Sequence, residues 1–170
     1  MANTYVKVGS TVTVGSGGSS TIDFTSIPAT YTDFLVKVSA RGTTTEALGG
    51  HYYSIALNGS ATSKSQRFLQ GDGSSATSGN SSSFTTYMTP SDYTTNTFSN
   101  AEIYLPNYAG SNNKSMSVDV VTENNATKSY AAFYAQLWSN IAAITQITLT
   151  ANAGLFAQYS TATLYGISKS

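Results

Sequence analysis

The feature that most constrains this chain is an alternation of apolar and polar residues with a period of two. In the range Phe34–Arg41, every second residue is apolar and lies on one face of an extended chain. Met116, Val118 and Val120 repeat the pattern, with Asp119 on the opposite face. Because side chains alternate between the two faces of a β-strand, this pattern predicts strands that are buried on one face.

The same pattern and its interruptions divide the whole chain into short strands. Turn-forming pairs such as Asn58-Gly59 and Asp72-Gly73 separate them, and none of the 3 prolines falls inside one. Many short strands with short connections predict an all-β fold, an antiparallel, jelly-roll-like β-sandwich in a single domain. The predicted strands are 4–8, 11–14, 20–26, 32–41, 51–57, 66–70, 83–88, 98–105, 115–122, 129–138, 143–151 and 160–168.

The domain organisation follows from these ranges. We expect residues 20–170 to form the β-sandwich domain and residues 1–19 to form an N-terminal arm or edge strands. The ranges 41–50 and 71–82 lack the alternation, and we expect irregular loops there. The range 129–138 also fits the spacing of a short helix. We favour a strand, because the segments around it are β and no helix cap precedes it.

Charge is scarce in this chain. Only 9% of the residues are charged, and eight basic residues balance eight acidic ones, whereas about 25% is usual. Nucleic-acid affinity depends on clustered Lys and Arg, so we expect no nucleic-acid partner. Polar residues interrupt the most apolar stretch, 130–156, so we expect no membrane span. The N-terminus has no charged start followed by an apolar run, so we expect no signal peptide.

No combination of residues predicts a catalytic or metal centre. His51 is the only histidine, it begins an aromatic strand, and no Gly-x-Ser-x-Gly motif accompanies it. Cysteine is absent, which excludes disulfides and thiolate metal sites. The carboxylates fall mostly on outward strand positions or in loops; a pair that meets on folding, as in glycoside hydrolases, is the enzymatic alternative. We therefore expect neither an enzyme nor a cofactor.

Aromatic residues near the C-terminal third raise the possibility of carbohydrate binding. If 129–138 is a strand, Tyr130, Tyr134 and Trp138 share one face. Exposed aromatic rings can stack on sugar rings, so these three are a possible glycan platform. A single Trp beside Phe133 and Leu137 is more often packed in a core. The sequence leaves both interpretations open.

Several segments resemble a known family. They are Thr21-Ile-Asp-Phe-Thr-Ser-Ile-Pro at the start of 21–41, the turn Leu57-Asn58-Gly59, Trp138 followed by Ile144-Thr-Gln-Ile-Thr-Leu, and the ending 160–167. Together they resemble the small jelly-roll structural proteins of tailed bacteriophages, of the marine-phage type, from about residue 20 to residue 168. Residues 1–19 match nothing in that family. The resemblance implies no catalytic residues.

What the resemblance implies is a virion structural protein. It implies capsid decoration or a head or tail appendage, capsid or tail proteins of the same virion as partners, assembly in the host cytoplasm, and a homo-oligomer with a trimer favoured. A nearly uncharged surface fits this, because charged residues are depleted at the centres of protein interfaces. We expect segment 1–10 to add a strand to a neighbour, with Asn3, Tyr5 and Lys7 as candidate partner contacts. The alternative is a carbohydrate-binding, receptor-binding domain with surface glycans as ligands.

Overall fold

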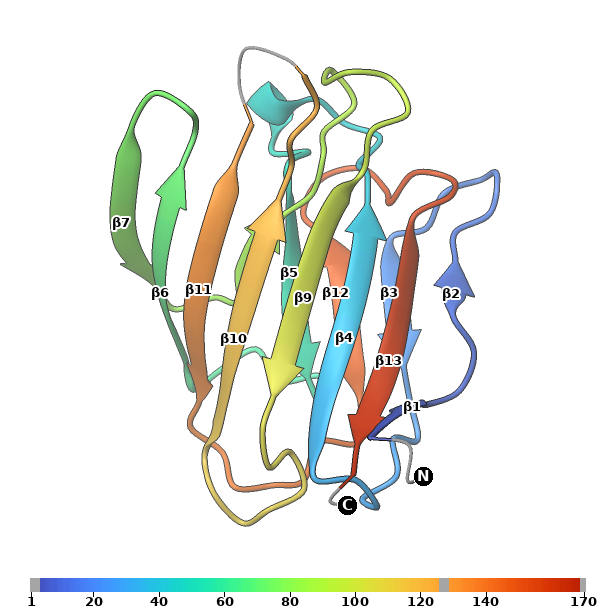
Figure 1. Cartoon of the computed structure of the whole chain (residues 1–170), viewed down its shortest axis with the longest axis vertical. Helices are drawn as coiled ribbons and strands as arrows, with labels where there is room; N and C mark the ends of the chain where they lie inside the picture. Colours follow the sequence, from blue (N-terminus) through green and yellow to red (C-terminus); the bar gives the residue numbers. More distant parts are fainter. Residues whose placement is uncertain (1–3, 126–128, 169–170) are drawn as a thin grey trace.

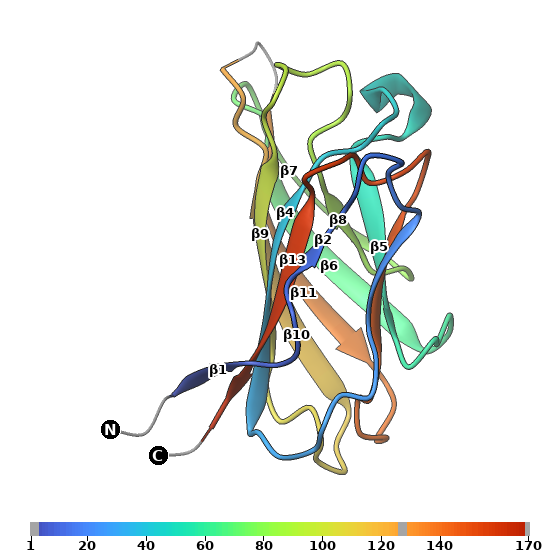
Figure 2. The same ribbon diagram turned by 90° about the vertical axis from the view of Figure 1, so that its right-hand side faces the viewer.

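The computed structural model describes residues 4–125 and 129–168. Two antiparallel β-sheets pack face to face, and Figure 2 shows them edge-on as two layers. The prediction of an all-β, jelly-roll-like β-sandwich is confirmed. Over the described ranges, no helix has the length and apolar character that a membrane-spanning helix needs.

The larger sheet has nine strands and the smaller sheet has four (Figure 1). The larger sheet has the order β1 (Tyr5–Lys7), β13 (Thr161–Ile167), β4 (Asp33–Ala40), β9 (Ser99–Leu105), β10 (Lys114–Val121), β11 (Ala131–Trp138), β6 (Lys64–Gly71) and β7 (Ala76–Ser81), and β2 (Val12–Thr13) pairs with β13. The smaller sheet has the order β3 (Thr21–Phe24), β12 (Ile147–Ala151), β5 (Tyr52–Leu57) and β8 (Thr85–Tyr87). One 3₁₀ turn, η1 (Glu46–Leu48), precedes β5.

The chain crosses repeatedly from one sheet to the other. The strands β3, β5, β8 and β12 lie in the smaller sheet, whereas β4, β9 and β13, which follow or precede them, lie in the larger one. This alternation is the jelly-roll arrangement. The strands β10, β11, β6 and β7 extend the larger sheet and place β7 at its edge (Figure 1).

The core lies between the two sheets. On β4, Phe34, Val36 and Val38 are buried, as the alternation predicts. Ile55 of β5 and Leu149 of β12 are buried on the facing sheet. Burial of such side chains is the main force that stabilises a fold of this kind, at about 25 cal/mol per Å² of apolar surface.

The ambiguous range 129–138 contains the strand β11. Its residues alternate with a period of two: Ala132, Tyr134 and Trp138 are buried, and Phe133 between them is exposed. The preference for a strand over a helix is confirmed. The helical spacing arose because both faces of β11 carry apolar residues.

The expectation of an irregular loop over 71–82 is wrong, because β7 (Ala76–Ser81) lies there. Its sequence of small polar residues has no alternation to reveal a strand. Backbone pairing with β6 holds β7 in place instead, in a register that runs from Gln66 opposite Ser81 to Gly71 opposite Ala76. The turn at Asp72-Gly73, which the sequence predicts, connects the two strands.

Residues of the N-terminal range also join the larger sheet. The strand β1 pairs with the end of β13, with Tyr5 opposite Ile167 and Lys7 opposite Tyr165. Figure 2 shows β1 and the end of β13 extending together beyond the body of the sandwich. β1 therefore forms the edge of the larger sheet opposite to β7.

Candidate functional site

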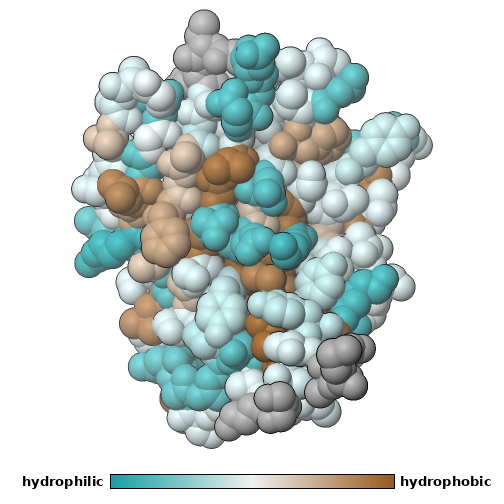
Figure 3. Space-filling model, viewed as in Figure 1, coloured by the Kyte–Doolittle hydropathy of each residue, from teal (hydrophilic) through white to brown (hydrophobic). Residues whose placement is uncertain are grey.

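The outer face of the larger sheet carries a cluster of exposed apolar side chains. Phe133 of β11 is 54% exposed, Leu69 of β6 is 60% exposed and Val121 of β10 is 45% exposed. Together with exposed Ala131, they form what we call the apolar strip. Figure 3 shows apolar residues gathered on this face of the molecule.

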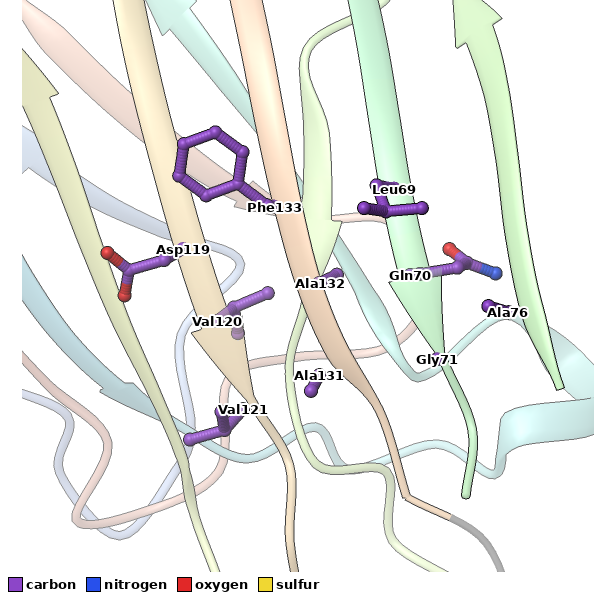
Figure 4. Close-up of a pocket in the computed structure, with 10 residues that line it drawn as sticks. All are labelled: Leu69, Gln70, Gly71, Ala76, Asp119, Val120, Val121, Ala131, Ala132 and Phe133. Atoms are coloured by element: carbon purple, nitrogen blue, oxygen red, sulfur yellow. The ribbon is translucent and has the colours of Figure 1, made fainter. Parts of the chain in front are cut away.

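Strand register brings the apolar strip together. Phe133 lies opposite Leu69 on β6, and Val121 lies opposite Ala131 on β11. Directly opposite residues of antiparallel strands have their Cβ atoms about 5 Å apart, so these side chains touch or nearly touch. Figure 4 shows Phe133 and Leu69 projecting from neighbouring strands. They border a shallow hollow of about 440 Å³ that Gln70, Ala76 and Asp119 also line.

β11 is unusual because it is apolar on both faces. Its inward residues are buried and, apart from Gln136, apolar, and its outward residues Ala131, Phe133, Ala135 and Leu137 are apolar as well. An antiparallel strand with one face in water normally alternates between apolar and polar residues, whereas a strand covered on both faces is apolar throughout. The composition of β11 is therefore that of a strand covered on its outer face too.

Charged residues flank the apolar strip in the same cross-strand row. Lys37, Glu102 and Asp119 lie opposite one another on β4, β9 and β10, and Asp119 lies opposite Phe133. The ammonium of Lys37 lies 2.6 Å from the Glu102 carboxylate. Burial, and then the negative charge of Glu102, raise the pKa of Asp119. The row thus changes from charged to apolar between β10 and β11.

A second hollow, of about 300 Å³, lies near β1 on the same sheet. Tyr5, Tyr165 and Leu35 line it together with the Lys37–Glu102 pair. We call it the tyrosine hollow. It combines aromatic faces with charged hydrogen-bonding groups on an exposed surface.

Tyr104 lies on the same outer face, beside the tyrosine hollow. It lies opposite Leu35 on β4, and its hydroxyl donates a 2.8 Å hydrogen bond to Asp33. That hydrogen bond, with burial and the charge of Asp33, raises the pKa of Tyr104. Tyr104 therefore adds a third tyrosine next to the hollow.

The predicted partner contacts fall partly on this surface. Tyr5 lines the tyrosine hollow, and Lys7 lies in the same strand opposite Tyr165. Asn3 lies outside the described residues. One side of β1 is already occupied by the chain's own β13, so the other side is the one that a neighbour could approach.

The predicted glycan platform is wrong as an exposed surface. Tyr130, Tyr134 and Trp138 are only 8%, 3% and 2% exposed. β11 turns Tyr134 and Trp138 inward, and Tyr130 just before it is buried as well. All three pack in the core, which was the other interpretation open from the sequence. The ring of Tyr130 stacks on Tyr87 with centroids 4.2 Å apart.

His51 packs within this buried aromatic group. Its ring stacks against Tyr87 and Tyr130, and its Nδ1 lies 3.1 Å from the backbone oxygen of Glu46. The carboxylate of Glu46 accepts hydrogen bonds from the hydroxyls of Tyr93 and Tyr130. These contacts tie the loop before β5 to the body of the sandwich.

The described residues contain no group of three or more His, Cys, Asp or Glu that could hold a metal ion.

The apolar strip and the tyrosine hollow are the features suited to binding, and both lie on the outer face of the larger sheet. The sequence signal for the strip was the presence of apolar residues at both odd and even positions of 131–138, a pattern that also fits helical spacing. Comparisons with protein-family models, with curated proteins and with solved structures found no match for this chain.

Proposed function

We propose that this chain is a non-enzymatic structural protein of a tailed-phage virion, which decorates the capsid or forms part of a head or tail appendage. The single observation that carries the proposal is the exposed apolar strip on the outer face of the larger sheet. The resemblance of segments 21–41 and 160–167 to phage jelly-roll proteins supplies the setting. In this proposal the strip contacts a neighbouring capsid or tail protein.

The energetics of the strip support protein contact. Burying a fully exposed Phe or Leu side chain stabilises a complex by about 1.5–3 kcal/mol. Phe133 and Leu69 are each about half exposed, so covering both contributes roughly 2 kcal/mol in total. Interface centres are poor in charge, and the strip itself carries none.

The test compares variants in binding to particles. Phage particles are purified from the source of the chain, stripped of this protein, and mixed with purified Leu69→Ser or Phe133→Ser. We expect each variant to bind the particles with about fivefold lower affinity than the unchanged protein, because each side chain contributes about 1 kcal/mol. Leu48→Ser is the matched control, because Leu48 is 71% exposed but lies in η1, away from the strip. Absence of the chain from purified particles, or equal binding by all variants, would contradict the proposal.

Carbohydrate binding is the second candidate function, and the tyrosine hollow is the observation that favours it. Tyr5 and Tyr165 offer ring faces beside the Lys37–Glu102 pair, which suits a neutral sugar with apolar faces and hydroxyl groups. Saturation-transfer NMR with galactose, glucose and N-acetylglucosamine oligomers would test it. We expect signals that Tyr165→Ala abolishes and Tyr159→Ala keeps; no signal from any sugar would contradict this candidate.

A further inference from the structure

The edge strand β7 has an unoccupied side. It pairs with β6 and with no other strand in the part of the chain that the structure describes. Figure 1 shows it as the outermost strand of the larger sheet, opposite to β1. At six residues it is long enough to form a ladder with a further strand.

Two hydrogen bonds fix which backbone groups of β7 point outward. The amide of Asp72 donates to the carbonyl of Ser75 at the turn, and the amide of Ser139 donates to the carbonyl of Ser63 beyond the other side of β6. Bonded and non-bonded pairs alternate along antiparallel strands. The first bond continues the β6–β7 ladder and shows that even-numbered residues of β6 form hydrogen-bonded pairs with the odd-numbered residues of β7 opposite them. The second bond shows that odd-numbered residues of β6 bond to β11 on the other side, which agrees. The amides and carbonyls of Ala76, Ser78 and Asn80 consequently point away from β6.

This edge lacks the usual devices that prevent strand addition. Natural edge strands are protected by charged residues, proline, bulges or short length. Ala76–Ser81 contains no charged residue and no proline, and its register with β6 is continuous. The opposite edge differs, because β1 has only three residues and includes Lys7.

The edge is also held in a fixed shape. A Cβ at Gly79 would lie 2.6 Å from the Cζ atom of Phe68, so the ring of Phe68 covers the glycine and clamps β7 to β6. The Asp72 carboxylate accepts hydrogen bonds from the backbone amides of Ser74 and Ser75 at the turn. A preformed strand loses little conformational freedom on binding, which favours association.

We propose that β7 pairs in antiparallel register with β7 of a second copy of the chain, with Ser78 opposite the second copy's Ser78. Only residues with outward backbone groups can form the hydrogen-bonded pairs, and Ser78 is the middle one of the three. In this register Ala76 lies opposite Asn80 of the other copy, and no like charges meet, because β7 has none. A second copy fits because a two-fold axis at Ser78 places the outward amides of one β7 opposite the outward carbonyls of the other, and the reverse.

The pairing has a consequence for the assembly. It joins the two larger sheets into one continuous sheet and places both apolar strips on the same side, since Ser78 lies in the cross-strand row of Phe133 and Leu69. The pairing adds a self-association step to the proposed function, and its role in assembly rests on that function. It predicts a two-fold pair, in place of the trimer that the resemblance implies.

Cysteine cross-linking tests the register directly, because the chain has no cysteine of its own. In Ser78→Cys the two introduced residues face each other with Cα atoms about 5.5 Å apart, within the range for a disulfide. In the matched control Asn80→Cys, they are offset by about 14 Å along the strands, too far for a disulfide. After copper–phenanthroline oxidation we expect a covalent dimer from Ser78→Cys only, which a reductant reverses.

A second variant keeps the inference testable if cysteine disturbs the edge. The amide of Ser78 points away from β6, so Ser78→Pro removes an outward donor and leaves the β6–β7 pairing intact. We expect light scattering to give about twice the 17.8 kDa chain mass for the unchanged protein and the monomer mass for Ser78→Pro. Equal far-UV circular dichroism spectra would show that the variant folds. An unchanged protein that is monomeric or trimeric would overturn the pairing, as would equal cross-linking of both cysteine variants. Neither result depends on particle binding, so the proposed function is tested separately.

Discussion

Phe133 lies directly opposite Leu69 across strands β11 and β6, and both side chains project from the outer face of the larger sheet. The residue before Phe133 and the residue after it are both buried in the core. β11 therefore has apolar residues on both of its faces, as strands that are covered on both sides have. This relationship connects the fold to the proposed assembly role, and it could be disturbed without unfolding the protein.

We expect Trp138 to report on the core and not on a ligand. It is the only tryptophan, and it is almost fully buried. Its fluorescence emission should be blue-shifted relative to free tryptophan, resistant to iodide quenching, and unchanged by saccharides. Trp138→Ala should lower the free energy of unfolding by about 3–5 kcal/mol in urea titrations. Ready quenching by iodide would contradict the burial of this side chain.

Asp72 should make stability depend on pH in the acid range. Hydrogen bonds from the amides of Ser75 and Ser74 lower its pKa from 3.8 to about 2. The folded state thus favours the carboxylate, so its stabilising effect is present above pH 3.8 and is lost as the pH falls towards 2. We expect the difference in melting temperature between the unchanged protein and Asp72→Asn to shrink over that interval. A difference that stays constant there would show that the turn does not hold the charged form.

Gly79→Ala should loosen the β6–β7 hairpin, because the added methyl group would meet the ring of Phe68. The expected loss in free energy of unfolding is about 1 kcal/mol, at the low end for overpacked sites, because the ring of Phe68 is only partly buried and has room to shift. In the Phe68→Ala background the same glycine substitution should cost much less, since the ring is gone. Equal costs in both backgrounds, measured by urea unfolding, would exclude the contact as the cause.

Arg41→Lys should loosen the loop between β8 and β9. The guanidinium donates hydrogen bonds to the backbone oxygens of Ser91, Tyr93, Thr94 and Thr97. A lysine ammonium cannot reproduce this fork of donors, so we expect a loss of roughly 2 kcal/mol. Hydrogen exchange should speed up in residues 91–97 before it does elsewhere; unchanged exchange in that loop would contradict this role for Arg41.

Period-two alternation was enough to predict most of the fold. Phe34, Val36 and Val38 lie at alternate positions, and Lys37 and Ser39 on the opposite face are polar, so the strand and its buried face are readable from the sequence. β7 was not readable, because Ala76–Ser81 consists of small and mostly polar residues and is held by pairing with β6. Such an edge strand forms because a neighbouring strand pairs with it, and the pattern of its own residues does not show that pairing.

The candidate site was harder to predict than the fold. The apolar character of 131–138 was visible, but its two parities resembled helical spacing and hid the exposed face. Which parity faces water depends on the register of β11 with β10 and β6. That register turned Trp138 inward and Phe133 outward, so the expected platform became core and the strip became surface.

The central claim is that the outer face of the larger sheet contacts neighbouring protein in a phage particle. Hydroxyl-radical footprinting of purified particles and of the isolated protein, read by mass spectrometry, tests it most directly. We predict that oxidation of Phe133 and Leu69 falls at least fivefold in the particle, whereas oxidation of exposed Leu48 stays the same. Equal labelling of Phe133 and Leu69 in both samples, or no trace of the chain in the particles, would contradict the account.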